Sequence, residues 1–140
     1  MKSLIAVLAL TLALPPLAAL AAEQANLDAG RKSVARGQFD NAIEQLERAI
    51  VADPRNPEGF MLLGESHRRQ GRLTAALKYL NIALELEPNH LEALRSKGDV
   101  LLAQGEREEA EAVLQHLRQR CGDCREYRRL RQKVAQAGNG

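Results

Sequence analysis

The chain has 140 residues, the length of one domain, and its 20 Lys and Arg residues nearly balance its 18 Asp and Glu residues. A near-neutral chain lacks the excess positive charge that nucleic-acid binding requires, so nucleic acid is excluded as a general partner. Trp is absent and aromatic residues make up 3% of the chain, so a core must be built from Leu, Ala, Ile and Val. This composition favours helices that pack closely through small side chains.

The first 21 residues have the pattern of a secretory signal peptide. Lys2 supplies a positive charge, residues 4–14 form an apolar run, and two prolines at 15–16 interrupt it. Residues 19–21 read Ala-Leu-Ala, a small-residue cleavage motif. An uncleaved membrane anchor is the alternative, but this run falls short of the roughly 20 apolar residues that a transmembrane helix needs. We therefore expect cleavage, export to the bacterial periplasm and no stable membrane span in the mature protein.

Small and apolar residues recur at a fixed spacing along the rest of the chain. The recurring positions, each 34 residues apart, are Gly30, Gly64 and Gly98; Gly37, Gly71 and Gly105; Ala42, Ala76 and Ala110; and Leu46, Leu80 and Leu114. A fixed period of this length indicates one supersecondary unit in three copies, whose apolar faces are buried only when the units stack. We predict units at residues 23–56, 57–90 and 91–122.

The middle unit shows why each copy should be a pair of helices. Asn56 is a good N-cap, and Pro57 suits the first helical position because its missing N–H would be unpaired there anyway. Gly71 should end this helix in the left-handed conformation, and Thr74 is placed to cap the second helix. Asn89 should cap the helix that opens the third unit. Each unit is therefore predicted to be an antiparallel helix pair.

The middle unit also resembles a tetratricopeptide repeat. The residues that carry the resemblance are Leu63, Gly64, His67, Gly71, Ala76, Leu80, Ala83 and Pro88. It extends over residues 23 to about 120. The resemblance implies an all-α solenoid, a right-handed superhelix of helix-turn-helix repeats whose first helices line a concave groove. In this family the groove usually holds a peptide or a partner helix. We expect three such repeats and a C-terminal capping helix.

The predicted partner-binding groove lies on the face of each first helix opposite its core stripe. Its candidate residues are Leu27, Arg31, Val34, Glu58, Met61, Glu65, Arg68, Arg95, Asp99 and Leu102. They combine apolar patches with both signs of charge, and Met61 is a soft, adaptable contact. A solvated helix face that binds nothing in particular is the alternative. Some relatives clamp a C-terminal carboxylate with Lys and Asn in this groove; Leu27 and Arg31 stand at matching points, so that clamp is not reproduced.

The only two cysteines, Cys121 and Cys124, lie at the end of the third unit. The first interpretation is a structural disulfide that pins the capping helix to the third unit, since export makes oxidation plausible. The second is a thiol redox centre resembling the Cys-x-x-Cys of thioredoxin, which prefers its first cysteine near a helix N-terminus. The third is a metal site that also uses His116, for which a fourth ligand is missing.

Residues 123–140 are predicted to form the capping helix and tail. Asp123 is placed to cap this helix, and Tyr127, Leu130 and Val134 share one face that would cover the open end of the stack. The outer face is basic and carries Arg125, Arg128, Arg129, Arg131 and Lys133. We expect this face to be solvated; docking to an acidic lipid or protein surface is the alternative.

The sequence predicts a binding protein and not an enzyme. No Ser/His/Asp set, paired carboxylates or phosphate loop can be assembled from the predicted elements, so we predict no catalytic residue, no cofactor and no metal. The expected function is a non-enzymatic scaffold that holds a partner polypeptide as part of an envelope assembly. The alternative is a thiol–disulfide or metal-binding module centred on Cys121 and Cys124. The oligomeric state and the identity of the partner stay open.

Overall fold

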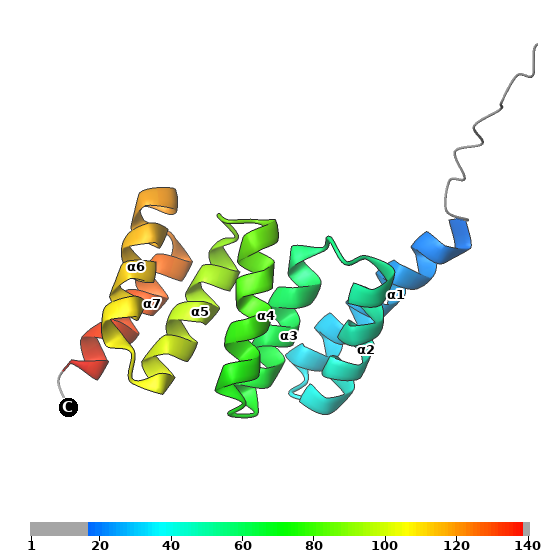
Figure 1. Ribbon diagram of the computed structural model, residues 1–140, viewed down its shortest axis with the longest axis horizontal. Helices are drawn as coiled ribbons and strands as arrows, with labels where there is room; N and C mark the ends of the chain where they lie inside the picture. The colour runs from blue at the N-terminus through cyan, green and yellow to red at the C-terminus, as the bar shows by residue number, and fades with distance from the viewer. Residues whose placement is uncertain (1–16, 139–140) are drawn as a thin grey trace, which may run out of the picture.

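The computed structural model describes residues 17–138, which form seven α-helices and no strand (Figure 1). The helices are α1 (Leu17–Ala35), α2 (Phe39–Ala52), α3 (Pro57–Arg69), α4 (Leu73–Leu86), α5 (Leu91–Gln104), α6 (Arg107–Cys121) and α7 (Arg125–Ala137). The predicted all-α solenoid of three helix pairs and a capping helix is confirmed. None of the helices in the described part of the chain is long and apolar enough to cross a bilayer.

Most of the predicted signal peptide, residues 1–16, lies outside the described residues. The described part begins at Leu17, where α1 starts, and this helix continues to Ala35. The predicted cleavage point after Ala21 therefore falls inside a helix in the uncleaved chain.

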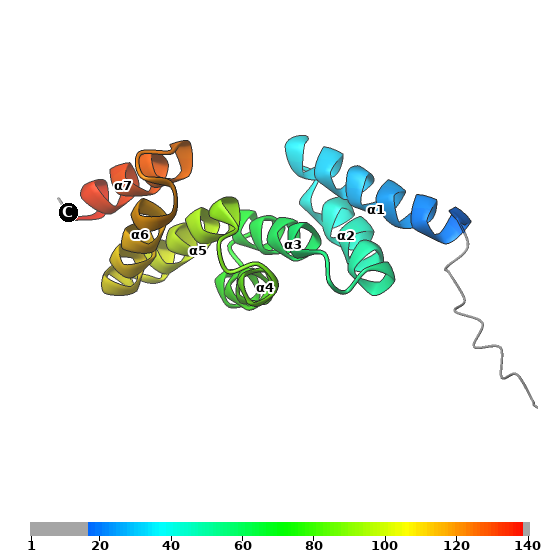
Figure 2. The same cartoon turned by 90° about the horizontal axis from the view of Figure 1, so that it is seen from above.

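The helices form a curved row in which each first helix contacts the next first helix. α1, α3 and α5 pack against their partners α2, α4 and α6, and α1 also contacts α3, as α3 contacts α5. The capping helix α7 packs against both α5 and α6. Seen from above, α1 and α7 stand at the two ends of one side of the row, with α3 and α5 between them (Figure 2). These four helices therefore share the concave face.

Glycine sets both the turns and the separation of the helices. Gly71 follows α3 with a φ of +73°, which a residue without Cβ adopts at little cost, so the predicted helix end is confirmed. Gly64 lies where α3 meets α4: a Cβ there would stand 2.6 Å from Leu80 Cγ and 3.2 Å from the Ala76 carbonyl oxygen. The two helices therefore approach closely at Gly64 and Ala76, and a larger side chain at Gly64 would push them apart.

Of the four predicted caps, one is correct. The Asn56 side chain accepts a hydrogen bond from the Glu58 backbone N–H at 3.0 Å, as predicted. The other three predictions miss the cap by one or two residues: the N-cap residues are Arg72 instead of Thr74, His90 instead of Asn89, and Cys124 instead of Asp123. The α3–α4 turn is closed by its backbone, with the Arg72 N–H donating to the His67 carbonyl at 2.9 Å, and no side chain caps α4.

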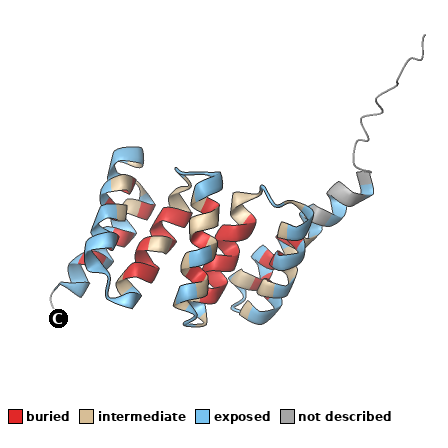
Figure 3. Cartoon of the chain, viewed as in Figure 1, coloured by how far each residue is buried: buried red, intermediate tan, exposed pale blue. Residues whose placement is uncertain are grey.

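Two apolar clusters fill the interior. One joins α1 to α4 and reaches α5 through Ala93 and Val100; the other joins α5, α6 and α7 around Leu117 and Leu130. Burial is most extensive on α3 and α5 (Figure 3). These helices carry the middle of the concave face and are held from both sides, so the surface that they present is rigid.

Candidate functional site: the concave groove

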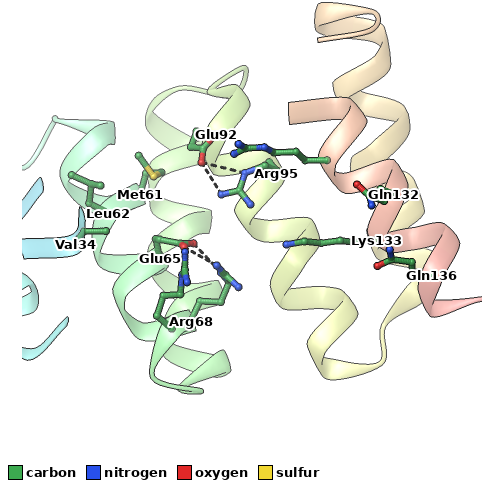
Figure 4. A pocket seen from close by; sticks show the side chains of 12 residues that line it. Val34, Met61, Leu62, Glu65, Arg68, Glu92, Arg95, Gln132, Lys133 and Gln136 are labelled. Atoms are coloured by element: carbon green, nitrogen blue, oxygen red, sulfur yellow. Dashed lines mark hydrogen bonds and ion pairs between the residues drawn. The ribbon is translucent and has the colours of Figure 1, made fainter. Parts of the chain in front are cut away.

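The concave face contains a groove with a cavity volume of about 570 Å³. Its walls come from four helices (Figure 4): Val34 on α1; Met61, Leu62, Glu65, Arg68 and Arg69 on α3; Glu92 and Arg95 on α5; and Arg129, Gln132, Lys133 and Gln136 on α7. A cavity that needs four helices exists only in the stacked array. It is therefore a property of the repeat assembly and not of any single helix pair.

Five of the ten predicted groove residues line this cavity. They are Val34, Met61, Glu65, Arg68 and Arg95. They lie on successive first helices, and the 34-residue period relates Val34 to Arg68 and Met61 to Arg95, so these residues project towards the same side. Val34 and Met61 supply apolar surface, whereas the other three supply charge.

The other five predicted residues lie outside the cavity, for different reasons. Leu27 is 5% exposed and belongs to the core of the first two repeats, and Leu102 packs against the core around α5, α6 and α7. Arg31 and Glu58 form an exposed ion pair of 2.7 Å that joins α1 to α3. The Asp99 side chain is only 2% exposed and lies beneath the groove, where it pairs with residues that line it.

Glu65 is the centre of a charged cluster on α3. Its carboxylate accepts hydrogen bonds from Arg68 Nη2 at 2.6 Å and Arg69 Nε at 2.8 Å, and from Ser96 Oγ of α5 at 3.3 Å. Burial alone would raise the pKa of Glu65, but the hydrogen bonds from Arg68 and Arg69 outweigh it and lower this pKa to about 2. Glu65 is therefore ionised at neutral pH, and its charge is taken up by its two arginine neighbours.

Arg95 extends the same network along α5. Its guanidinium donates to Glu92 Oε1 at 2.7 Å and to Asp99 Oδ2 at 2.5 Å, one helical turn away on either side. Burial disfavours the charged form, yet the hydrogen bond to Glu92 and the attraction of nearby carboxylates raise the pKa of Arg95. A buried arginine held by two carboxylates has little freedom, so the floor of the groove is preorganised.

Lys133 closes the network from α7, which corrects its predicted place on the outer face. Its Nζ donates to Asp99 Oδ2 at 2.7 Å, across 34 residues of sequence. No residue of α7 was predicted to line the groove. Extending the 34-residue period to a fourth copy would have found three of them, because positions 95, 99 and 102 lead to Arg129, Lys133 and Gln136. The capping helix thus occupies the place of the first helix of a fourth repeat.

The remaining candidates lie away from the groove. Cys121 and Cys124 are paired, with their Cα atoms 5.5 Å apart, and join the end of α6 to the start of α7. His116 accepts a hydrogen bond from Arg120 Nε at 3.4 Å. Within residues 17–138 no group of three or more His, Cys, Asp or Glu side chains could hold a metal ion.

His67 is a packing residue of the middle repeat. It is 8% exposed, and its ring stacks on Tyr79 with centroids 5.2 Å apart and an interplanar angle of 7°. Burial, assisted by the charge of Arg72, lowers the pKa of His67 and favours the neutral ring. This histidine therefore packs inside the middle repeat and does not line the groove.

Comparison with known proteins agrees with this architecture. Residues 35–117, more than half of the chain, match the family model described as anaphase-promoting complex, cyclosome, subunit 3. The chain belongs to this family. Among curated proteins, it is 33% identical over 86 residues to the bovine DnaJ homolog subfamily C member 3, an alignment that covers 61% of this chain and 17% of that protein. It is 36% identical over 67 residues to anaphase-promoting complex subunit 3 of Dictyostelium discoideum, covering 48% and 7%. The chain thus spans a small part of these relatives.

Solved structures identify the fold as a tetratricopeptide repeat. The first such domain of Spaghetti (RPAP3), bound to the HSP90 peptide SRMEEVD, has a TM-score of 0.74 at 23% identity and covers 87% of this chain and 94% of its own. The TPR2B domain of yeast Sti1 in its pHsp70 complex has a TM-score of 0.79 at 18% identity, with 85% and 98% covered. At these identities the likeness shows the fold alone, and it confirms the resemblance that the sequence pattern indicated.

Proposed function

We propose that this protein is a non-enzymatic interaction module that holds a segment of a partner polypeptide in the concave groove. The observation that carries the proposal is the groove itself: four helices bring three apolar and nine polar or charged side chains around one cavity. Binding sites for peptides on helical repeats have this combination of apolar contact surface and fixed polar groups.

The rigidity of the groove floor supports the proposal. Glu65 is held by Arg68 and Arg69, Arg95 is held by Asp99, and the Ser96 hydroxyl links the two groups, all before any partner arrives. A preorganised surface loses less side-chain entropy on binding than a flexible one, so more of the contact energy is available as affinity. Related domains whose structures contain an HSP90 or an HSP70 peptide support a peptide as the class of ligand.

Selection from a random library of 12-residue peptides, displayed on phage and captured by the immobilised full chain, tests the groove. We expect peptides to be enriched over a surface without protein. The affinity of an enriched peptide should fall at least about tenfold in Met61→Ala/Arg68→Ala, because both an apolar and a charged wall are removed. Circular dichroism checks that the variant keeps its helices.

The matched control removes one apolar residue and one arginine from the second helices. Arg48 and Leu86 lie on α2 and α4 and are exposed, so Arg48→Ala/Leu86→Ala should leave the affinity unchanged. Equal affinity for the wild type and Met61→Ala/Arg68→Ala would count against the groove. Absence of any enriched peptide would count against the proposed function as a whole.

We also propose that the module acts in the bacterial periplasm, as the leader pattern of residues 1–21 indicates. Expression of the chain from Met1 in a Gram-negative host, followed by fractionation and intact-mass measurement, tests this proposal. The expected product is periplasmic and lacks residues 1–21. A full-length product in the cytoplasmic fraction would contradict it.

A second candidate is a thiol–disulfide module, favoured by the pairing of Cys121 with Cys124. Under the first proposal this pair is a structural link, and a ring this short stabilises the fold by about 2 kcal/mol. Cys121→Ser/Cys124→Ser should then lower the melting temperature and leave peptide affinity intact. Under the second candidate the wild type exchanges its disulfide with glutathione rapidly, and the variant loses this reaction while its stability and peptide affinity persist.

A further inference from the structure

The groove continues onto the outer face of the capping helix. A second, shallower hollow of about 700 Å³ lies on α7, lined by Arg125, Arg128, Arg129, Arg131, Gln132 and Ala135. Arg129 and Gln132 line this hollow and the groove at once. At 100° per residue they lie on the edge of α7 between its groove side, which carries Lys133, and its outer side, which carries Arg128. One continuous surface therefore runs from the concave face over α7.

This surface has opposite chemical character at its two ends. Val34, Leu62 and Met61 form an apolar patch at the end formed by α1 and α3, and the side chains from α7 stand at the other end (Figure 4). From Arg129 onwards the surface becomes strongly basic. The position of the apolar patch thus determines which end of a bound ligand must be apolar.

The carboxylates of the groove do not cancel its positive charge. Glu65 is paired with Arg68 and Arg69, and Glu92 and Asp99 are paired with Arg95 and Lys133. Five basic side chains line the groove. The acidic side chains number three: Glu65 and Glu92, which line the groove, and Asp99, which lies beneath it. Positive charge is therefore in excess before the outer face of α7 is counted.

The arginines of the α7 face retain capacity for an anionic ligand. Among the ion pairs of residues 17–138, none involves Arg129 or Arg131. Arg125 and Arg128 pair with Glu126 and Asp123, but their side chains remain 65% and 54% exposed. A guanidinium has five N–H donors, so a single carboxylate neighbour leaves most of them available.

We propose that the partner segment consists of an apolar anchor joined to an acidic stretch. The anchor lies against Val34, Met61 and Leu62, and the acidic stretch leaves the groove over Arg129 and lies along the arginine face of α7. This inference rests on the proposed function and adds to it the chemical class of the partner and its direction across the repeats. The continuity of the two hollows favours a polypeptide over an anionic membrane, because a bilayer surface cannot extend into the groove.

The sequences of the selected peptides give the first test. We expect one or two large apolar residues and, to one side of them, three or more Asp or Glu residues within the 12 positions. Enrichment of peptides without an acidic excess would overturn this inference and leave the proposed function in place. Failure to enrich any peptide would count against both.

Affinity measurements on one selected peptide give the second test. Removal of the junction arginine in Arg129→Gln should weaken binding about fivefold, and Arg125→Gln/Arg131→Gln about threefold, with a smaller dependence on salt concentration in both variants. The matched control Arg48→Gln/Arg55→Gln removes two exposed arginines from the N-terminal half and should change nothing.

A double-mutant cycle separates this route from a general effect of charge. Replacing the acidic residues of the peptide by Gln should remove the effect of Arg129→Gln, because the interacting groups are then absent from one side. If Arg129→Gln and the Arg48→Gln/Arg55→Gln control weaken binding equally, the proposed route over α7 is wrong. The route is also wrong if vesicles of phosphatidylglycerol bind the chain and compete fully with the peptide.

Discussion

The middle repeat and the third repeat use the same recurring glycine differently. In the middle repeat, Gly64 of α3 faces Leu80 of α4, its own partner helix. In the third repeat, the neighbour of Gly98 on α5 is Leu130 of the capping helix α7. In the middle repeat this glycine lets the two helices of one pair pack closely. In the third repeat it lets α7, a helix from outside the pair, pack closely against α5. α7 consequently lies close to α5, and this position places Lys133 against Asp99 and brings the α7 side chains into the groove.

This difference indicates that a repeat position has a fixed geometry but no fixed partner. The absence of a side chain at Gly64 allows tight packing within one repeat. The same absence at Gly98 allows α7 to dock, and α7 supplies part of the binding surface. Changes at the α3–α4 contact of the middle repeat should therefore alter stability, and changes at the α5–α7 contact should alter stability and binding together.

The largest effect should come from the seam of the middle repeat. Leu80 is fully buried between α3 and α4, so Leu80→Ala removes apolar contacts and leaves a cavity. We expect the free energy of unfolding, measured by urea denaturation, to fall by about 3 kcal/mol. Leu86→Ala, at a leucine of the same helix that is 39% exposed, should cost less than about 1 kcal/mol. Similar losses at the two sites would mean that the α3–α4 seam is not tightly packed.

A slightly smaller loss should follow overpacking at the α5–α7 contact. Gly98→Val places a branched side chain against Leu130, and we expect a loss of about 2 kcal/mol. Hydrogen exchange should accelerate in α7 while α3 and α4 keep their protection. Uniform acceleration along the chain would contradict the assignment of this glycine to the docking of α7 alone.

Removal of the buried carboxylate beneath the groove should lower the free energy of unfolding by a similar amount. Asp99→Asn leaves Arg95 and Lys133 without their shared counter-charge, and we expect a loss of about 2 kcal/mol together with weaker peptide binding. Glu44→Gln is the surface control, because the exposed pair of Glu44 with Arg48 contributes less than about 1 kcal/mol. An Asp99→Asn variant as stable as the control would show that the charged floor is not a structural element.

A further effect should appear as a dependence on pH. Because the folded state lowers the pKa of Glu65 from 4.5 to about 2, the folded protein binds this proton more weakly than the unfolded chain. The stabilisation by Glu65 is complete above pH 4.5 and is lost as the pH falls from 4.5 towards 2. The stability difference between the wild type and Glu65→Gln, measured by urea denaturation, should therefore shrink over this range. A difference that stays constant down to pH 2 would contradict the pairing with Arg68 and Arg69.

The repeated part of the fold could be predicted because its residues recur. Gly64 packs against Leu80 as Gly30 packs against Leu46, one period earlier, so the helix pairs follow from the period. The groove follows less completely, because its residues change from copy to copy. Leu27, Met61 and Arg95 occupy equivalent positions and all three are buried, yet only Met61 and Arg95 line the groove. Burial at the open end of a solenoid depends on which neighbour is present, and the period alone does not supply that information.

The role of α7 was missed for a related reason. Its amphipathic pattern correctly placed Leu130 and Val134 towards the core, but amphipathicity does not distinguish the solvent side of a helix from a side that faces a groove. Lys133 was assigned to solvent on that basis, whereas Asp99, 34 residues earlier, is its partner. A search for charge pairs one period apart would have found this contact.

Chemical-shift mapping of the ¹⁵N-labelled protein with a selected peptide tests the central claim most directly. We expect the largest shifts to cluster on α1, α3, α5 and α7, around Val34, Met61, Arg95 and Arg129, while α2, α4 and α6 change little. Shifts concentrated on the outer surfaces of α2, α4 and α6 would contradict the proposed binding site.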